Sequence, residues 1–249
     1  TLSGFLLADS VTATYSRVAG ETVAGGPYAI SAVLSPTGVL DNYVITYNTA
    51  DFTITAKPIT ITPDDGQSKV FGVADPNFTF IHTLLEGSDS FTGELERDPG
   101  SDVGTYAFTL GTLSAGSNYT LSLDTGHTFA ITAKSVTITP DDGQSKVYGE
   151  IDPIFTYTHT PLEGTDSFTG GLGRAAGSDV GTYAYTLGTL SAGANYALTL
   201  DDGHIFTITK ATAIVTLENL IQAYDGTPKS VTVTTTPIGL TVDVTYDGS

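Results

Sequence analysis

A long internal repeat is the feature that most constrains how this chain can fold. Residues 57–129 align with residues 134–206 at a constant offset of 77, and 53 of the 73 aligned positions are identical. The segment that begins at Lys57 returns almost unchanged at Lys134. Repetition at a fixed period is typical of arrays built from one structural unit. We therefore expect copies of one module rather than a single large core.

The flanking segments align with parts of the same unit. Asn42-Tyr43 corresponds to Asn118-Tyr119, for example, and a Tyr-Asp-Gly sequence near the C-terminus replaces the Val-(Phe/Tyr)-Gly of the repeat. Because both ends fall inside a module, we expect the chain to be a piece of a longer polypeptide. The predicted parts are the C-terminal part of a divergent module at 1–56, complete modules at 57–133 and 134–209, and the N-terminal part of a module of another subtype at 210–249.

Within a module, apolar residues alternate with polar ones, which predicts strands with one buried face. The series Tyr106, Phe108, Leu110 is one example, and the run from Leu240 to Tyr246 is another. Gly and Asp interrupt these runs every 8–12 residues or so, and no segment of ten or more residues has a helical period. The sequence therefore predicts an all-β fold with very little helix.

About seven short strands in each repeat favour a small two-layer β-sandwich of Ig-like size. A β-grasp-like module with one short helical turn near Leu85–Gly87 is the alternative. Between modules, the segment from Ile131 to Val136 is too short and too poor in Gly and Ser to be a flexible linker. We therefore expect the modules to lie end to end as a rod.

The motif Val103-Gly-Thr-Tyr106 comes directly before an alternating strand. This placement predicts a tyrosine corner, in which the phenol donates a hydrogen bond back to the main chain. The first fragment departs from the motif, with Val23-Ala-Gly-Gly-Pro-Tyr28 in its place. Whether that fragment keeps the corner is left open by the sequence.

Charge and composition exclude several kinds of partner. The chain has 9 Lys and Arg against 27 Asp and Glu, a net charge of −18. Nucleic acids and acidic membranes both require clustered positive charge, so neither is an expected partner. No apolar run of about 18 residues is present, so no membrane insertion is expected. The absence of cysteine excludes disulfides, thiolate zinc sites and thiol catalysis.

We do not expect an enzyme, because catalysis needs one asymmetric set of residues and the polar residues here recur in each module. The sequence contains no nucleophile elbow and no Gly-rich phosphate loop. His82 and His127 reappear as His159 and His204, and a metal site would require the two histidines of one module to converge. We therefore predict no catalytic, cofactor-binding or metal-binding residues and no cofactor.

Calcium is the one cofactor left open, because several aspartates near the module ends offer the hard oxygen ligands that this ion prefers. These residues are Asp64, Asp65, Asp75, Asp124, Asp141, Asp142, Asp152, Asp201 and Asp202. Aspartate is also a good turn residue, and no EF-hand spacing is present.

Two further sites are also considered. An isopeptide bond could join Lys69 to Asn118, or Lys146 to Asn195, although solvated Lys and turn-capping Asn are the simpler interpretation. The thirteen tyrosines could bind glycans, but most share the register of the apolar face, which favours core packing.

The combined motifs resemble the MBG repeat family of bacterial surface proteins. These are Lys-x-Val-(Phe/Tyr)-Gly-x-x-Asp-Pro-x-Phe-Thr, Gly-(Ser/Thr)-Asp-Ser-Phe-Thr-Gly, Val-Gly-Thr-Tyr, Asn-Tyr and Phe-x-Ile-Thr-x-Lys. The segment from Tyr224 to Thr235 is similar to the related YDG-type opening. The resemblance implies a secreted, repetitive adhesin or surface filament. It transfers no catalytic residue, since such families carry no established ones.

These observations lead to one main functional hypothesis. The modules are expected to be structural spacers in the stalk of a large bacterial extracellular adhesin or surface filament. Their partners would be neighbouring modules of the same chain and other copies in a fibre. The alternative is a set of repeated glycan- or ligand-binding adhesive modules. An exposed aromatic patch shared by the two complete modules would favour that alternative.

Overall fold

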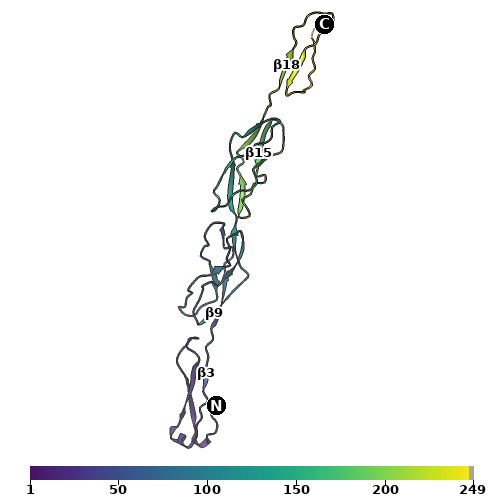
Figure 1. The fold of residues 1–249 in the computed structure, drawn as a ribbon. Helices are drawn as coiled ribbons and strands as arrows, with labels where there is room; N and C mark the ends of the chain where they lie inside the picture. The colour runs from purple at the N-terminus through teal and green to yellow at the C-terminus, as the bar shows by residue number, and fades with distance from the viewer. Residues whose placement is uncertain (247–249) are drawn as a thin grey trace. The chain divides into compact units, whose positions relative to one another are not determined.

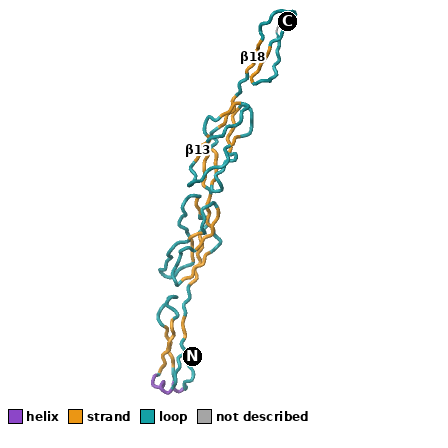
Figure 2. Tube along the Cα trace, in the orientation of Figure 1, coloured by secondary structure: helices purple, strands orange, loops and turns teal. Residues whose placement is uncertain are grey.

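The computed structural model describes residues 1–246, so the last three residues of the predicted part 210–249 lie outside the described residues. The chain divides into two compact units, Thr1–Lys134 and Ser135–Ser249. Strands and loops account for nearly all of it (Figures 1 and 2). In the described part, the helical segments are the short 3-10 turns η1 (Leu7–Asp9) and η2 (Thr37–Asn42). The predicted all-β class is confirmed.

The first fragment forms a three-stranded antiparallel sheet in the order β1-β2-β3. Its strands are β1 (Thr12–Arg17), β2 (Tyr28–Ser35) and β3 (Ala50–Phe52). Tyr28 and Leu34 of β2 are buried.

Two sheets make up module 57–133. One has the order β6-β4-β9 and the other the order β5-β10-β8-β7. The seven strands are β4 (Lys57–Pro63), β5 (Ser68–Val70), β6 (Phe80–His82), β7 (Glu96–Arg97), β8 (Gly104–Thr109), β9 (Tyr119–Leu123) and β10 (Thr128–Thr132). In Figure 1 the chain enters this module at one end and leaves it at the other.

The first and last parts of the module are joined by two parallel strand pairs. β4 pairs in parallel with β9, from Lys57 opposite Tyr119 to Ile61 opposite Leu123. β5 pairs in parallel with β10. Each half of the module therefore depends on the other half for its backbone hydrogen bonds. The segment near Leu85–Gly87 forms a turn closed by a bond from Asp89 N to Glu86 O (3.1 Å), and not the helical turn of the β-grasp alternative.

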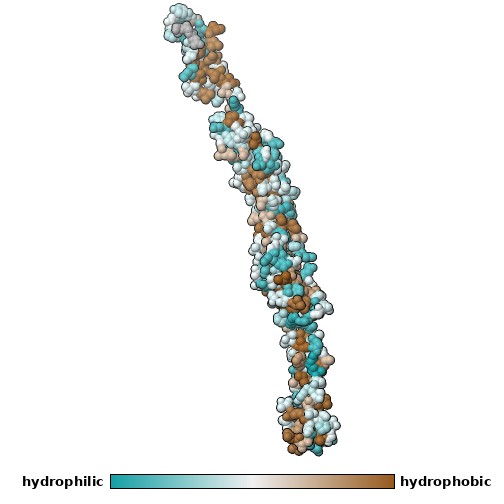
Figure 3. All heavy atoms as spheres, turned by 180° about the vertical axis from the view of Figure 1, so that it is seen from behind, coloured by the Kyte–Doolittle hydropathy of each residue, from teal (hydrophilic) through white to brown (hydrophobic). Residues whose placement is uncertain are grey.

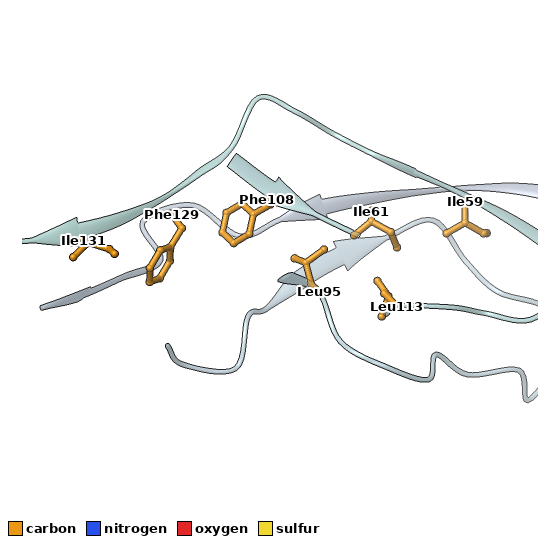
Figure 4. Packing of buried hydrophobic residues seen from close by; sticks show 7 residues of the cluster. All are labelled: Ile59, Ile61, Leu95, Phe108, Leu113, Phe129 and Ile131. Carbon is orange, nitrogen blue, oxygen red and sulfur yellow. The ribbon is translucent and has the colours of Figure 1, made fainter. Parts of the chain in front are cut away.

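The core lies between the two sheets, as the sandwich form of the prediction requires (Figure 4). Ile59 and Ile61 of β4 and Phe129 of β10 are fully buried. The other buried members of this cluster are Leu95, Phe108, Leu113 and Ile131. At ~1.5–3 kcal/mol per buried large apolar side chain, this single cluster is the main source of the module's stability.

Module 134–209 repeats this arrangement, with sheets in the orders β13-β11-β16 and β12-β17-β15-β14. Its strands are β11 (Lys134–Pro140), β12 (Ser145–Val147), β13 (Tyr157–His159), β14 (Gly173–Arg174), β15 (Gly181–Thr186), β16 (Tyr196–Leu200) and β17 (Ile205–Thr209). Val136, Ile138 and Phe206 are fully buried at the positions equivalent to Ile59, Ile61 and Phe129.

The C-terminal fragment is a two-stranded antiparallel sheet of β18 (Ile214–Glu218) and β19 (Thr232–Thr236). Apolar side chains of β18, including Val215 and Leu217, are about half exposed, and Figure 3 shows apolar residues gathered over this fragment. The strand predicted between Leu240 and Tyr246 is wrong, because these residues lie in irregular structure and form no strand.

Candidate functional site

The most charged site of module 57–133 is centred on Asp75, which accepts from two cations. Lys69 Nζ lies 2.6 Å from Asp75 Oδ1, Arg97 Nε lies 2.7 Å from Oδ2, and Arg97 Nη2 lies 3.0 Å from Oδ1. The side chains of Lys69 and Arg97 are only 11% and 8% exposed. The hydrogen bond from Arg97 is the largest cause of the lowered pKa of Asp75, and Lys69 adds to it. Asp75 is therefore held as the anion.

The guanidinium of Arg97 also lies over two aromatic rings of the same sheet. It is 4.7 Å from the ring centroid of Tyr106 on β8 and 5.3 Å from that of Phe129 on β10. A cation over a ring face contributes ~0.5–2 kcal/mol, more where water is excluded. We call the set of Lys69, Asp75, Arg97, Tyr106 and Phe129 the charged clamp. It ties the loop after β5 to β7, β8 and β10.

The charged clamp recurs in module 134–209 with closely similar distances. Lys146 Nζ lies 2.6 Å and Arg174 Nε 2.8 Å from the carboxylate of Asp152, whose pKa is lowered in the same way. Arg174 lies over Tyr183 and Phe206 at 4.8 and 5.3 Å. The first fragment keeps the cation over its rings, since Arg17 lies over Tyr28 and Phe52, and its ion pair is with Glu21.

The lysines considered for isopeptide bonds belong to the charged clamps and do not face the asparagines. Asn118 Oδ1 accepts from Val23 N (2.9 Å) of the first fragment, and Asn118 O accepts from Lys57 N (2.8 Å). Lys69 contacts Asp75 instead. An amide bond between Lys69 and Asp75 would require a protonated Asp75, and Arg97 lowers the pKa of that carboxyl group. The structure therefore does not bring Lys69 and Asn118 together.

The histidines of one module lie apart and make different contacts. His127 Nδ1 lies 2.7 Å from Asp65 Oδ1, and His127 Nε2 lies 3.7 Å from Asp124 Oδ2. His82 Nδ1 lies 2.9 Å from the carbonyl oxygen of Thr83, and its ring packs against Phe91. The pattern repeats at His204, with Asp142 and Asp201, and at His159.

Among the aspartates considered as calcium ligands, Asp75 and Asp152 are paired with Lys and Arg. In residues 1–246, no group of three or more His, Asp or Glu side chains is placed to hold a metal ion.

The predicted tyrosine corner is confirmed. Tyr106 OH donates to Asp102 O at 2.7 Å, and Tyr183 OH donates to Asp179 O at 2.7 Å. The first fragment keeps the bond despite its different motif, because Tyr28 OH donates to Thr22 O at 2.7 Å. The ring of Tyr106 packs directly on Gly100, where an added Cβ atom would lie 2.2 Å from it.

A second tyrosine, in the Asn-Tyr motif, holds the long loop of each module. Tyr119 OH donates to Asp89 Oδ2 at 2.7 Å and accepts from Glu86 N at 2.9 Å, and the bond to Asp89 raises the pKa of Tyr119. Tyr196 makes the equivalent contacts with Asp166 and Glu163. Tyr43 does the same with Asp9 and Leu6. The position thus has one structural role in all three parts.

Gln67, a polar residue that makes three hydrogen bonds, was not identified from the sequence. Gln67 Nε2 donates to Asp64 O (3.0 Å) and Thr79 O (2.9 Å), while Gln67 Oε1 accepts from Thr79 N (2.8 Å). Gln144 makes the same three bonds one repeat later. Gln222 bridges Asn219 O and Ser230 O in the C-terminal fragment. The signal was present, since Gln67 and Gln144 both follow an Asp-Asp-Gly turn.

The Tyr-Asp-Gly segment of the C-terminal fragment forms a local turn. Asp225 Oδ1 accepts from Thr227 N (3.0 Å) and Thr227 Oγ1 (2.6 Å), and Lys229 contacts the other carboxylate oxygen. Lys229 is the largest cause that lowers the pKa of Asp225 to about 2. The segment therefore makes turn contacts of its own.

Comparison with known protein families places nearly all of residues 59–249 in one group. The family model described as "MBG domain (YGX type)" matches residues 59–129 and 136–207, and a second model, described as "MBG domain", matches residues 213–249. Neither a curated protein nor a solved structure matches the chain.

In the described residues, no helix has the length and apolar character to cross a bilayer. MBG repeats are typical of bacterial surface proteins and are non-catalytic modules. The internal repeat, the repeated contacts and the family matches agree, and the chain belongs to the MBG domain family, with tandem MBG modules across residues 59–249.

Proposed function

We propose that this chain is a spacer segment in the stalk of a bacterial extracellular adhesin or surface filament. Its working parts would be the complete modules 57–133 and 134–209, flanked by the module parts 1–56 and 210–249. The function is geometric, because each complete module has its own buried core and its own charged clamp. The high negative charge limits association between neighbouring stalks.

The main support for the proposal is that the segments connecting successive modules are very short. Ala133 alone separates the end of β10 from the start of β11, and four residues separate β3 from β4. Pro58, near the start of β4, has a fixed φ and no amide donor, which further stiffens that connection. A strand that leads directly into the next module transmits orientation much better than a Gly- and Ser-rich linker.

A second support comes from the contact between the first fragment and module 57–133. Asn118 Oδ1 accepts from Val23 N, 95 residues earlier in the chain, while Asn118 O accepts from Lys57 N. One residue thus binds both the connecting strand and the corner loop of the preceding fragment. This contact supports a connection that resists bending.

The alternative of repeated glycan binding needs an exposed aromatic patch in both complete modules. Within residues 57–209, Tyr148 is the one Phe or Tyr with a strongly exposed side chain, at 50%. Its counterpart Phe71 is only partly exposed. The two modules therefore have no aromatic patch in common, which favours the spacer.

Small-angle X-ray scattering of the full chain tests the proposal. A compact body of this length would have a radius of gyration of about 18 Å. Two complete modules of about 40 Å each, from strands of about ten residues, together with the two module parts, would make a rod with roughly twice that value. A result near the compact value would reject the spacer.

A further inference from the structure

Module 57–133 has a groove of about 530 Å³ where the edges of its two sheets approach each other. Its lining includes Phe80 of β6, Phe91 and the segment from Glu94 to Pro99 around β7. β6 and β7 are each the outermost strand of their sheet. The groove therefore follows an open edge of the sandwich.

The edge at β7 has backbone groups that are directed away from the sheet. Asp98 N donates to Ala107 O (2.8 Å), and Glu94 O accepts from Thr112 N (3.2 Å), so both residues turn their backbone groups toward β8 and the loop after it. Backbone groups alternate along an antiparallel strand, so those of Leu95 and Arg97 point to the opposite side. Such an edge can accept an additional extended strand.

Three carboxylates accompany this edge. Glu94, Glu96 and Asp98 are exposed and alternate with Leu95 and Arg97, which are turned inward. Side chains two residues apart on a strand are ~7 Å apart, so the three form a row with that spacing. In residues 1–246, no hydrogen bond or ion pair engages these three carboxylates, whereas Asp75 in the same groove is held by Lys69 and Arg97.

The second complete module lacks the row. Gly171, Gly173 and Ala175 occupy the equivalent positions, although Leu172 and Arg174 are unchanged and β14 pairs with β15 as β7 pairs with β8. The carboxylates are therefore not needed to form this edge. They distinguish one module from an otherwise nearly identical neighbour.

We propose that the groove of module 57–133 binds an extended peptide with basic residues at alternate positions, which adds as a strand along β7. Lys or Arg at every second position of such a strand has the same ~7 Å spacing as the carboxylate row. Phe80 and Phe91 pack against the core cluster with Leu95 and offer apolar surface to the other, uncharged set of alternate side chains of the added strand. A single metal ion does not fit, because carboxylates this far apart cannot all reach it. The site goes beyond a pure spacer role.

Titration of the full chain with two synthetic peptides at low salt tests this site. One peptide has the sequence TKTKTKT and the other TTKKKTT, so that composition and charge are equal and only the spacing differs. We expect the alternating peptide to bind more tightly and to weaken as salt is added. Equal affinity for both peptides would overturn the proposed strand addition.

Variants of the chain then locate the site. E94Q/E96Q/D98N should lose about tenfold or more in affinity for the alternating peptide, since three ion pairs are removed. The matched control D41N/D51N/E218Q changes the net charge equally at exposed positions outside this module and should bind as the parent does. An equal loss in both variants would show non-specific attraction and reject the site.

The second module supplies a gain-of-function test. G171E/G173E/A175D installs the row on β14 and should add a second binding event to the titration. Heat capacity scans of all variants show whether each remains folded. If G171E/G173E/A175D is folded but binds no additional peptide, the proposal is contradicted, because the carboxylate row on β14 would then not create a binding site.

Discussion

At the scale of single residues, the modules are held by a few polar contacts that surround a small core. Asp75 forms ion pairs with two largely buried cations, Lys69 and Arg97, and the rings of Tyr106 and Phe129 lie under the guanidinium. Removal of one member of a buried charged group leaves the others without compensation. The charged clamp therefore stabilises the module only while all of its charged members are present.

Substitution D75N tests the charged clamp. It should destabilise the module by about 1–3 kcal/mol, because two cations lose their charged partner while the shape is kept. Urea unfolding measures the loss, and D152N, in the repeated clamp, should give a similar value. A change below a few tenths of a kcal/mol in both variants would show that the clamp contributes little.

The clamp also predicts the pH dependence of stability. Arg97 lowers the pKa of Asp75 in the folded state, so the carboxylate stabilises the module above the unfolded-state pKa of about 3.9. This contribution is lost as the pH falls through the lower folded-state pKa. The melting temperature should therefore fall more steeply between neutral and acid pH for the parent than for the double variant D75N/D152N. Parallel curves would contradict this assignment.

Gly100 is required by the tyrosine corner. Its φ is +153°, and an added Cβ atom would lie 2.2 Å from the ring of Tyr106. G100A should therefore cost clearly more stability than G66A, where φ is +75° and no atom lies within 4 Å of the added Cβ. Thermal unfolding compares the two variants. Equal losses would mean that the ring moves aside without cost.

At the scale of strands, alternation predicted much of the fold but not the pairing. Tyr106 and Phe108 of the predicted series lie in β8, which ends at Thr109, and the sequence correctly indicated which face of this strand is buried. A period of two identifies a face and not a neighbour, so the parallel pairs β4–β9 and β5–β10 could not be predicted. The charged clamp was missed for the same reason, since Lys69 on β5 and Arg97 on β7 are brought to Asp75 only by the strand order β5-β10-β8-β7.

The first fragment shows how strongly strands depend on partners. Residues 43–47 align with β9, yet they form no strand, because no strand equivalent to β4 lies beside them in the described structure. A correct alternating pattern is therefore not sufficient for a strand when the neighbour is missing.

Gln67 should be as important to its loop as a buried apolar residue. Q67A removes the three bonds that join the Asp64 turn to Thr79 and should cost about 1–3 kcal/mol. Q67E keeps the shape and the acceptor for Thr79 N but turns a carboxylate oxygen toward the carbonyl oxygens of Asp64 and Thr79, so at neutral pH it should be at least as destabilising as Q67A. The urea midpoints of the parent, Q67A and Q67E give the order of stability. Midpoints of both variants equal to that of the parent would contradict this role of Gln67.

At the scale of the whole molecule, the connections between modules decide whether the chain can act as a spacer. N118A should free the amide of Val23, because Asn118 Oδ1 is its acceptor, while the core of module 57–133 is untouched. Hydrogen exchange at Val23 should accelerate about tenfold or more with little change in the module's melting temperature. Unchanged exchange at Val23 would show that this contact does not hold the connection.

The most direct measurement is the distance between two equivalent points in successive modules. The chain contains no cysteine, so spin labels can be placed at S68C on β5 and S145C on β12 alone. Pulsed electron paramagnetic resonance should give one narrow distance distribution centred near the module length, ~40 Å. A broad distribution, or a main distance far shorter than that, would contradict a chain of modules that works by holding its length.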